Sequence, residues 1–268
     1  MKSFSTVSKK QSAYIAQLQK VISDYISTID KTDIAAILLS GSVARGDYYP
    51  GKFGAKIDLT FMKKRNSTIT SESILGPDLD PHIPYHCTKW GNEEFQIAFD
   101  NYIDVDSFQL QNESRKSALL ESSILYDPDG VYLHDLTSIH KYAAVDQRNL
   151  KNTSVSYIDY LLSDYKKDKW EQRDAFPQLH QNLNTAFQQW LKCIYYCNSK
   201  YAPAEDRRLY YSYELQSLPE NYNLIITNFH HQDIGSEIDY KRREDIFKNQ
   251  LLPYVLIEIA NDKTEEKA

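Results

Sequence analysis

The residues of this chain that could do chemistry begin at a short turn of small side chains. Gly41 and Ser42 follow an apolar run that ends at Leu39. Glycine lets the backbone approach a ligand closely, and serine offers a hydroxyl and an N–H to a phosphate oxygen. If a helix begins at Val43, its N-terminus also favours an anion, and Arg45 could add positive charge. The turn is therefore predicted to bind phosphate.

Acidic side chains follow the turn on two predicted strands. Alternation along residues 57–62 places Asp58 on the face opposite the apolar residues. Mg²⁺ prefers one or two carboxylates together with waters and substrate phosphates. A further strand predicted over residues 102–108 carries Asp104 and Asp106 on one face, so Asp104 could reach the same metal and Asp106 could act as a general base. The alternative is that these two acids lie on a solvated strand face.

The elements that must position these residues are visible as changes of hydrophobic period. A stripe of apolar residues predicts a helix over 11–29, and short apolar runs predict strands over 33–39 and 57–62. Residues 48–54 contain proline and glycine and are predicted as a loop. A Gly-Asn pair between two apolar runs predicts a hairpin of strands 85–90 and 95–99, and residues 68–84 look like an insertion.

The second half of the chain shows mainly the hydrophobic spacing of helices. Helical patterns are predicted over 136–146, 152–170, 179–198, 205–215 and 236–259. We therefore predict an α+β chain with a mixed-sheet domain at residues 1–135 and an all-α helical bundle at 136–268.

Composition narrows the possible partners. The 268 residues carry a formal net charge of −6, which argues against a broad nucleic-acid surface. No apolar run approaches the roughly 18–20 residues needed to span a bilayer, and the polar N-terminus lacks a signal core. Three cysteines are too few for a disulfide framework. We expect a cytoplasmic protein without a membrane partner, whereas the oligomeric state is open.

The turn and the strand that follows it resemble a known enzyme family. Gly41 to Gly46, a loop, and Ile57-Asp58-Leu59 are similar to the nucleotidyltransferases of the DNA polymerase β superfamily, and look closest to the bacterial aminoglycoside and lincosamide branch. That family has a Gly-Ser turn, about ten further residues, and Asp-x-Asp on the next strand. Residues 125–130 and 198–222 also resemble the link and the helical C-terminal domain of that branch.

The resemblance implies a fold, a reaction and a set of site residues. It implies a polymerase-β-like domain that transfers a nucleoside monophosphate, AMP from ATP, to a hydroxyl of a small molecule with Mg²⁺. Gly41 and Ser42 would hold the triphosphate. Asp58 would be the second acid of the pair and Asp104 the third acid on the neighbouring strand, with Asp106 as the other choice. By analogy, Lys192 in the helical half could reach the triphosphate.

One residue departs from the family pattern. Lys56 stands where the first acid of the Asp-x-Asp pair is expected. An ammonium cannot bind Mg²⁺ and would form an ion pair with Asp58. Lys56 could replace the charge of one metal and contact phosphate directly, could mark a domain that binds nucleotide without transfer, or could be an engineered change.

Three functions therefore stay open from the sequence. The first is a Mg²⁺-dependent nucleotidyltransferase with a nucleoside triphosphate and a small hydroxylated acceptor as substrates. The second is a nucleotide-binding pseudoenzyme that serves as a regulatory module. The third is a nucleotidyltransferase of the toxin–antitoxin type that modifies a protein.

Overall fold

The computed structural model describes the backbone of residues 9–48 and 56–265. The chain divides into two compact units, Met1–Tyr142 and Ala143–Ala268, and each is described by itself. The sequence places this boundary at residues 135 and 136. Nearly all of the loop predicted over 48–54 lies outside the described residues.

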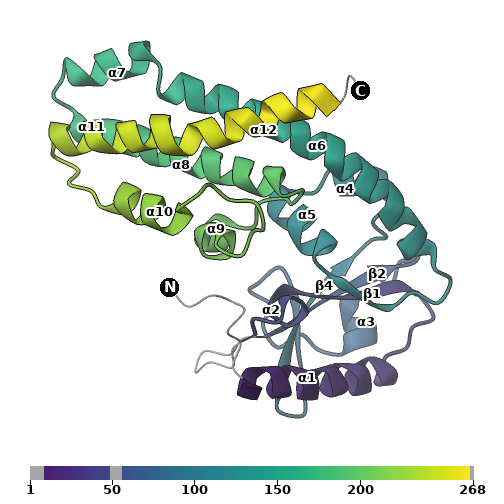
Figure 1. Ribbon diagram of the computed structural model, residues 1–268. Helices are drawn as coiled ribbons and strands as arrows, with labels where there is room; N and C mark the ends of the chain where they lie inside the picture. Colours follow the sequence, from purple (N-terminus) through teal and green to yellow (C-terminus); the bar gives the residue numbers. More distant parts are fainter. Residues whose placement is uncertain (1–8, 49–55, 266–268) are drawn as a thin grey trace. The chain divides into compact units, whose positions relative to one another are not determined.

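The first unit contains a mixed five-stranded sheet in the order β3-β4-β2-β1-β5. Strands β4, β2 and β1 of this sheet are labelled in Figure 1. Strands β2 and β4 pair in parallel, and the other neighbours are antiparallel. The predicted hairpin is confirmed as β3 and β4, whereas β5 was not predicted. The strands are β1 (Ile34–Ser40), β2 (Ile57–Lys63), β3 (His86–Trp90), β4 (Glu93–Asp100) and β5 (Ser123–Tyr126).

Helices cover the two faces of this sheet differently. The amphipathic helix α1 (Lys9–Thr28) places Leu18 and Ile22 in one cluster with Leu59 and other inward residues of β1, β2 and β4. On the opposite face, Arg115 of α5 (Glu113–Leu120) donates to Thr60 Oγ1 at 3.2 Å. The remaining helices are α2 (Gly41–Arg45), α3 (Ser71–Leu75), α4 (Val105–Gln109) and the start of α6 (Val131–Leu161).

Every regular element that the structure describes in the second unit is a helix. Its core surrounds Trp190 of α8, which is fully buried and donates its indole N–H to the main-chain oxygen of Leu251 at 2.8 Å. After α6 come α7 (Asp164–Glu171), α8 (Phe176–Cys197), α9 (Glu205–Ser212), α10 (Tyr222–His230), α11 (Glu237–Ile246), a π-helical stretch (Phe247–Leu251) and α12 (Leu252–Glu265).

Several predicted helix boundaries change in the structure. The helices predicted at 136–146 and 152–170 become one long helix, α6, followed by α7. The helix predicted at 236–259 is α11 and α12, joined by the π-helical stretch just before Pro253. Proline lacks an N–H and crowds the carbonyl four residues earlier, so a wider turn accommodates it.

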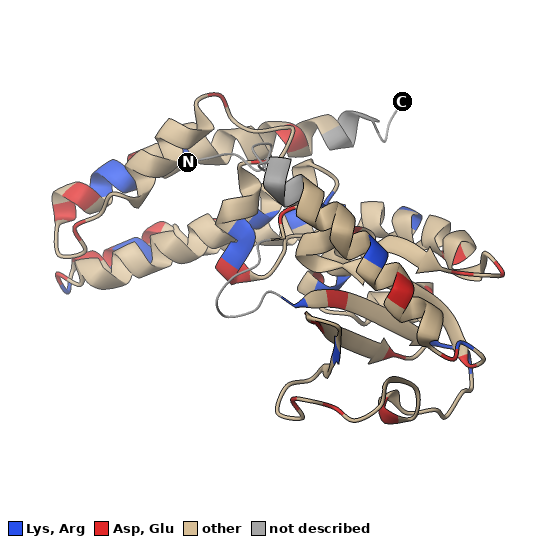
Figure 2. Cartoon of the chain, turned by 90° about the horizontal axis from the view of Figure 1, so that it is seen from below, with Lys and Arg blue, Asp and Glu red and all other residues tan. Residues whose placement is uncertain are grey.

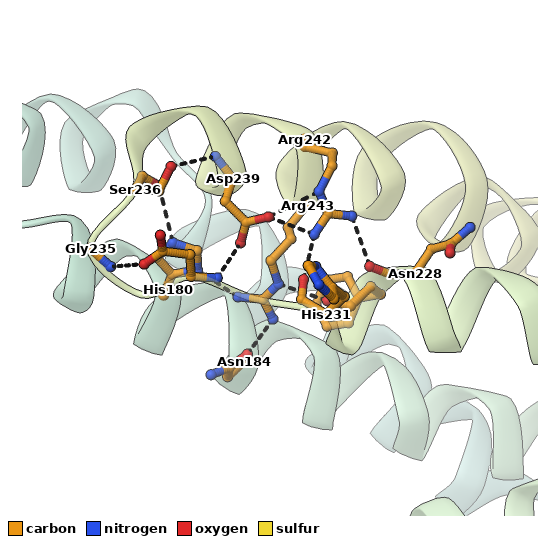
Figure 3. Close-up of polar contacts among 11 residues, drawn as sticks. His180, Asn184, Asn228, His231, Gly235, Ser236, Asp239, Arg242 and Arg243 are labelled. Carbon is orange, nitrogen blue, oxygen red and sulfur yellow. Dashed lines mark hydrogen bonds and ion pairs between the residues drawn. The ribbon is translucent and has the colours of Figure 1, made fainter.

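A buried arginine holds α8, α10 and α11 of the second unit together (Figure 3). Arg243 lies 2.6 Å from His180 Nδ1 and donates to Asn184 Oδ1 at 2.6 Å and to the main-chain oxygen of Phe229 at 2.7 Å. Its guanidinium also lies 4.5 Å from the centre of the Phe229 ring. Arginine has no acceptor atom, so His180 must be neutral at Nδ1 to accept this bond.

Charged residues of both signs are scattered along the described elements, as the blue and red segments of Figure 2 show. Within the part of the chain that the structure describes, no helix is long and apolar enough to cross a bilayer.

Candidate functional site

The closest approach at the predicted site joins the glycine turn to the carboxylate of Asp58. Strand β1 ends at Ser40, and Gly41 turns the chain with a φ of +67° into the short helix α2. A Cβ atom built on Gly41 would overlap Asp58 Oδ2 and lie 2.8 Å from Asp58 Cγ. With the Asp58 carboxylate in this position, a larger residue at 41 would require Asp58 to move, so the sequence expectation of a close backbone approach has a specific neighbour.

The sheet register continues this arrangement across four strands. Ser40 pairs with Asp58, Asp58 with Gln96 of β4, and Gln96 with Cys87 of β3. Side chains of directly paired residues stand on the same face of a sheet. Gln96 is therefore the β4 residue beside Asp58, on the face opposite helix α1.

On the face of the sheet opposite helix α1, side chains become less buried towards the Gly41 turn. Thr60 is buried under α5, where Arg115 contacts it, whereas Asp58 is half-buried. The Lys56 side chain, two residues earlier, is 25% exposed. The polar side chains near the turn are therefore partly open to a ligand.

Lys56 extends across β4 to strand β3. Its Nζ lies 3.2 Å from Cys87 Sγ and 3.9 Å from Asp80 Oδ2. The hydrogen bond to Cys87 raises the pKa of the Lys56 amine, and partial burial opposes this shift. The Lys56 ammonium therefore contacts Cys87 and Asp80, whereas the sequence predicted an ion pair with Asp58.

Tyr48, at the end of the first described segment, adds a buried phenol near this site. Burial, with smaller contributions from charges that include Asp58, raises the pKa of Tyr48 to about 12. Its ring stacks on Tyr14 with the ring centres 6.0 Å apart. The phenol therefore stays neutral at physiological pH.

Asp104 and Asp106 do not lie on a strand, so this part of the sequence prediction is wrong. Asp104 is the N-cap of α4, where its carboxylate accepts from the N–H of Ser107 at 3.1 Å and from the Ser107 hydroxyl at 2.7 Å. Asp106 lies in the first turn of that helix and is exposed. Asp-x-x-Ser is a capping signal, and capping outweighed the apparent alternation of residues 102–108.

The register also separates Asp104 from Asp58. Asp58 pairs with Gln96, and Met62, near the other end of β2, pairs with Asp100. Four residues of strand span roughly 13 Å, and Asp104 follows Asp100 further along the chain. The structure therefore does not bring the two predicted metal ligands together.

Asp104 instead belongs to a second polar cluster at the far end of β2. Arg65 Nη2 lies 3.2 Å from Asp104 Oδ2 and 3.6 Å from Asp135 Oδ2. The hydrogen bonds from Ser107, and then Arg65, lower the pKa of Asp104. Among the described residues, no three histidine, cysteine or acidic side chains gather as a metal site.

The other two predicted cations, Arg45 and Lys192, also have defined places. Arg45 of α2 lies 3.4 Å from Asp47 and 3.9 Å from Glu121, so acidic neighbours already share its charge. Lys192 lies half-buried on α8 in the second unit, and its role at the triphosphate stays a prediction.

Sequence reasoning missed Gln96 and Cys87 as neighbours of the site. The two-residue loop Gly91-Asn92 sets Trp90 opposite Glu93 and so places Cys87 opposite Gln96, which the sequence could have revealed. The parallel pairing of β4 with β2 had no local signal, because the two strands are joined through a long segment.

Comparison with models of known protein families gives no match, and neither does comparison with curated protein sequences.

Proposed function

We propose that the first unit is a nucleotidyltransferase-like domain that binds ATP with Mg²⁺ at the Gly41-Ser42 turn and Asp58. The observation that carries this proposal is the contact between Gly41 and the Asp58 carboxylate, which a Cβ atom would abolish. A turn that presents backbone N–H groups beside one carboxylate suits a triphosphate and the metal that accompanies it. The mixed sheet is compatible with a polymerase-β-like fold, and the second unit would be its helical bundle.

The side chains around Asp58 favour binding without efficient transfer. Two positions that could supply further metal ligands hold Lys56 and Gln96. An ammonium repels Mg²⁺, and an amide adds no negative charge to offset the metal. Asp104 lies at the far end of β2 and cannot replace them without a rearrangement of the sheet. In this proposal the domain is a nucleotide-binding module with a regulatory role.

A second candidate is transfer of AMP to a hydroxyl of a small molecule, or of a protein, with one metal. The observation in its favour is the position of Lys56, whose ammonium lies on the same face as Asp58 and is partly exposed. A fixed cation there would neutralise developing charge on a phosphate oxygen, as a second metal would.

Pyrophosphate release separates the two candidates. We would measure ATP binding in the presence of Mg²⁺, and pyrophosphate release over a panel of hydroxylated acceptors, for the wild type and for the Lys56→Asp/Gln96→Asp variant. The binding-module proposal predicts ATP binding without release in the wild type and a gain of release in the variant. Release by the wild type that disappears in Lys56→Gln would establish the one-metal enzyme instead.

ATP binding by the wild type that is unchanged in Asp58→Asn would exclude both candidates. Asp104→Asn is the matched control, because it removes a carboxylate charge of the same unit at the other end of β2. We expect this control to bind ATP as the wild type does.

A further inference from the structure

The amine of Lys56 donates a hydrogen bond to the thiol of Cys87 in the first unit. The two residues are 31 positions apart, and strand β4 lies between the strands that carry them. Their Nζ and Sγ atoms are 3.2 Å apart, and Asp80 Oδ2 lies 3.9 Å from the same nitrogen. The contacts with Cys87 and Asp80 therefore hold the Lys56 amine beside the thiol.

We propose that Lys56 and Cys87 form a covalent nitrogen–oxygen–sulfur bridge when the protein meets dioxygen. The amine and the thiol react with one O₂, and one oxygen atom becomes the bridge while the other leaves as water. The Lys56 ammonium first releases one proton to solvent; the N–O and O–S bonds then form, the O–O bond is cleaved, and the hydrogens of the broken S–H bond and one broken N–H bond leave in the water. Nitrogen and sulfur each give up two electrons, which are the four that dioxygen accepts.

Burial determines which oxidation product this cysteine can form. Cys87 is 3% exposed, which hinders a second thiol from approaching along the line needed for disulfide formation. Dioxygen is small enough to enter, and the nearest nucleophile is the Lys56 amine. The distance of 3.2 Å is too long for a direct bond and leaves space for one bridging atom after a small movement of the flexible lysine.

The bridge would change the charge beside Asp58. A nitrogen bonded to oxygen is a much weaker base than an alkyl amine, so the bridge removes the positive charge of Lys56. This consequence rests on the proposed nucleotide site in the form of the second candidate, because it follows only if the Lys56 ammonium faces a phosphate oxygen. A lost charge-assisted hydrogen bond corresponds to about tenfold weaker binding.

Peptide mapping of the full chain tests the bridge directly. The protein is incubated in dioxygen-saturated buffer or kept anaerobic with dithiothreitol, then digested with trypsin and analysed by mass spectrometry. We expect a linked pair of peptides containing Lys56 and Cys87 that has gained one oxygen and lost two hydrogens. Cleavage after Lys56 should be lost, and dithiothreitol should restore both free peptides.

Variants and a second cysteine control the experiment. Lys56→Arg keeps a cation but has no primary amine, and Cys87→Ser removes the thiol, so neither should give the linked peptides. Cys193→Ser should leave the bridge intact, because Cys193 is equally buried but its Sγ donates to the main-chain oxygen of Lys151 at 3.7 Å. Oxygen added to Cys87 without a link to Lys56, or no change after incubation, would overturn the proposal.

ATP affinity then tests the consequence separately. The dissociation constant for ATP is compared between bridged and reduced protein, with a tenfold increase expected for the bridged form. If the bridge forms and affinity is unchanged, the regulatory part fails while the bridge stands. If no bridge forms but ATP binds through Asp58, the covalent proposal fails and the nucleotide site stands.

Discussion

Replacement of Gly41 by alanine tests whether the turn and Asp58 are packed as the structure describes. Two effects of the alanine substitution destabilise the folded state at this position, and their free energies add. Alanine at a φ of +67° costs about 1–2 kcal/mol, because its Cβ crowds the following carbonyl. The new Cβ would also overlap Asp58 Oδ2, and inserting an atom into a packed site costs about 1–3 kcal/mol. We therefore expect Gly41→Ala to destabilise the first unit by about 2–5 kcal/mol.

Gly130 provides a matched control for the backbone contribution. Its φ is +65°, and a Cβ built on it meets nothing within 4 Å. Gly130→Ala should therefore show only the left-handed backbone cost of about 1–2 kcal/mol. The difference between the two alanine variants measures the overlap with Asp58.

Hydrogen exchange of the β1 and β2 amides is the appropriate assay, because a chain of two units need not unfold in one step. In a double-mutant cycle, Asp58→Ala should remove most of the extra cost of Gly41→Ala, giving a coupling of about 1–3 kcal/mol. Equal effects of Gly41→Ala and Gly130→Ala, with no coupling to Asp58, would refute the contact between Gly41 and Asp58.

Three further predictions concern the remaining polar clusters. Burial lowers the pKa of His180, so the unfolded chain binds a proton at this imidazole more readily than the folded chain does. The free energy of unfolding of the second unit should therefore be constant above about pH 6.5 and fall as the pH drops below that value. Urea unfolding between pH 8 and pH 5 measures this dependence. His180→Gln should reduce that dependence and leave the part due to His230, whose pKa burial also lowers. Arg243→Met should destabilise the second unit by at least about 3 kcal/mol, because it leaves buried acceptors on His180, Asn184 and Phe229 unpaired, and thermal melting would show a lower midpoint. Asp104→Ala should cost about 1 kcal/mol through the lost cap of α4 in urea unfolding, and a much smaller loss would contradict the capping role.

The local pattern of the sequence was sufficient for the elements that surround the turn. Helix α1, strands β1 and β2, and the β3–β4 hairpin each follow from a hydrophobic period and a loop signal within a few residues. The break at Gly41 and the outward position of Asp58 follow from the same rules. These features are confirmed because neighbouring residues determine them.

The sequence was less informative about which side chains lie beside Asp58, because these neighbours depend on pairing between strands that are distant in the sequence. Placing Gln96 beside Asp58 requires the parallel pairing of β4 with β2, which no nearby residue specifies. Asp104 was assigned to a strand although Asp-x-x-Ser, completed by Ser107, is a helix-start signal. The contact of Lys56 with Cys87 crosses a third strand and is likewise a product of the sheet order.

Calorimetric titration of ATP in the presence and absence of Mg²⁺ tests most directly whether ATP binds at the Gly41-Ser42 turn with Asp58. The wild type should bind ATP more tightly with Mg²⁺. Asp58→Asn should lose this metal dependence and bind at least about tenfold more weakly, a change of about 1.4 kcal/mol, whereas Asp104→Asn should match the wild type. Equal affinity of Asp58→Asn and the wild type, or an equal loss in Asp104→Asn, would contradict the account.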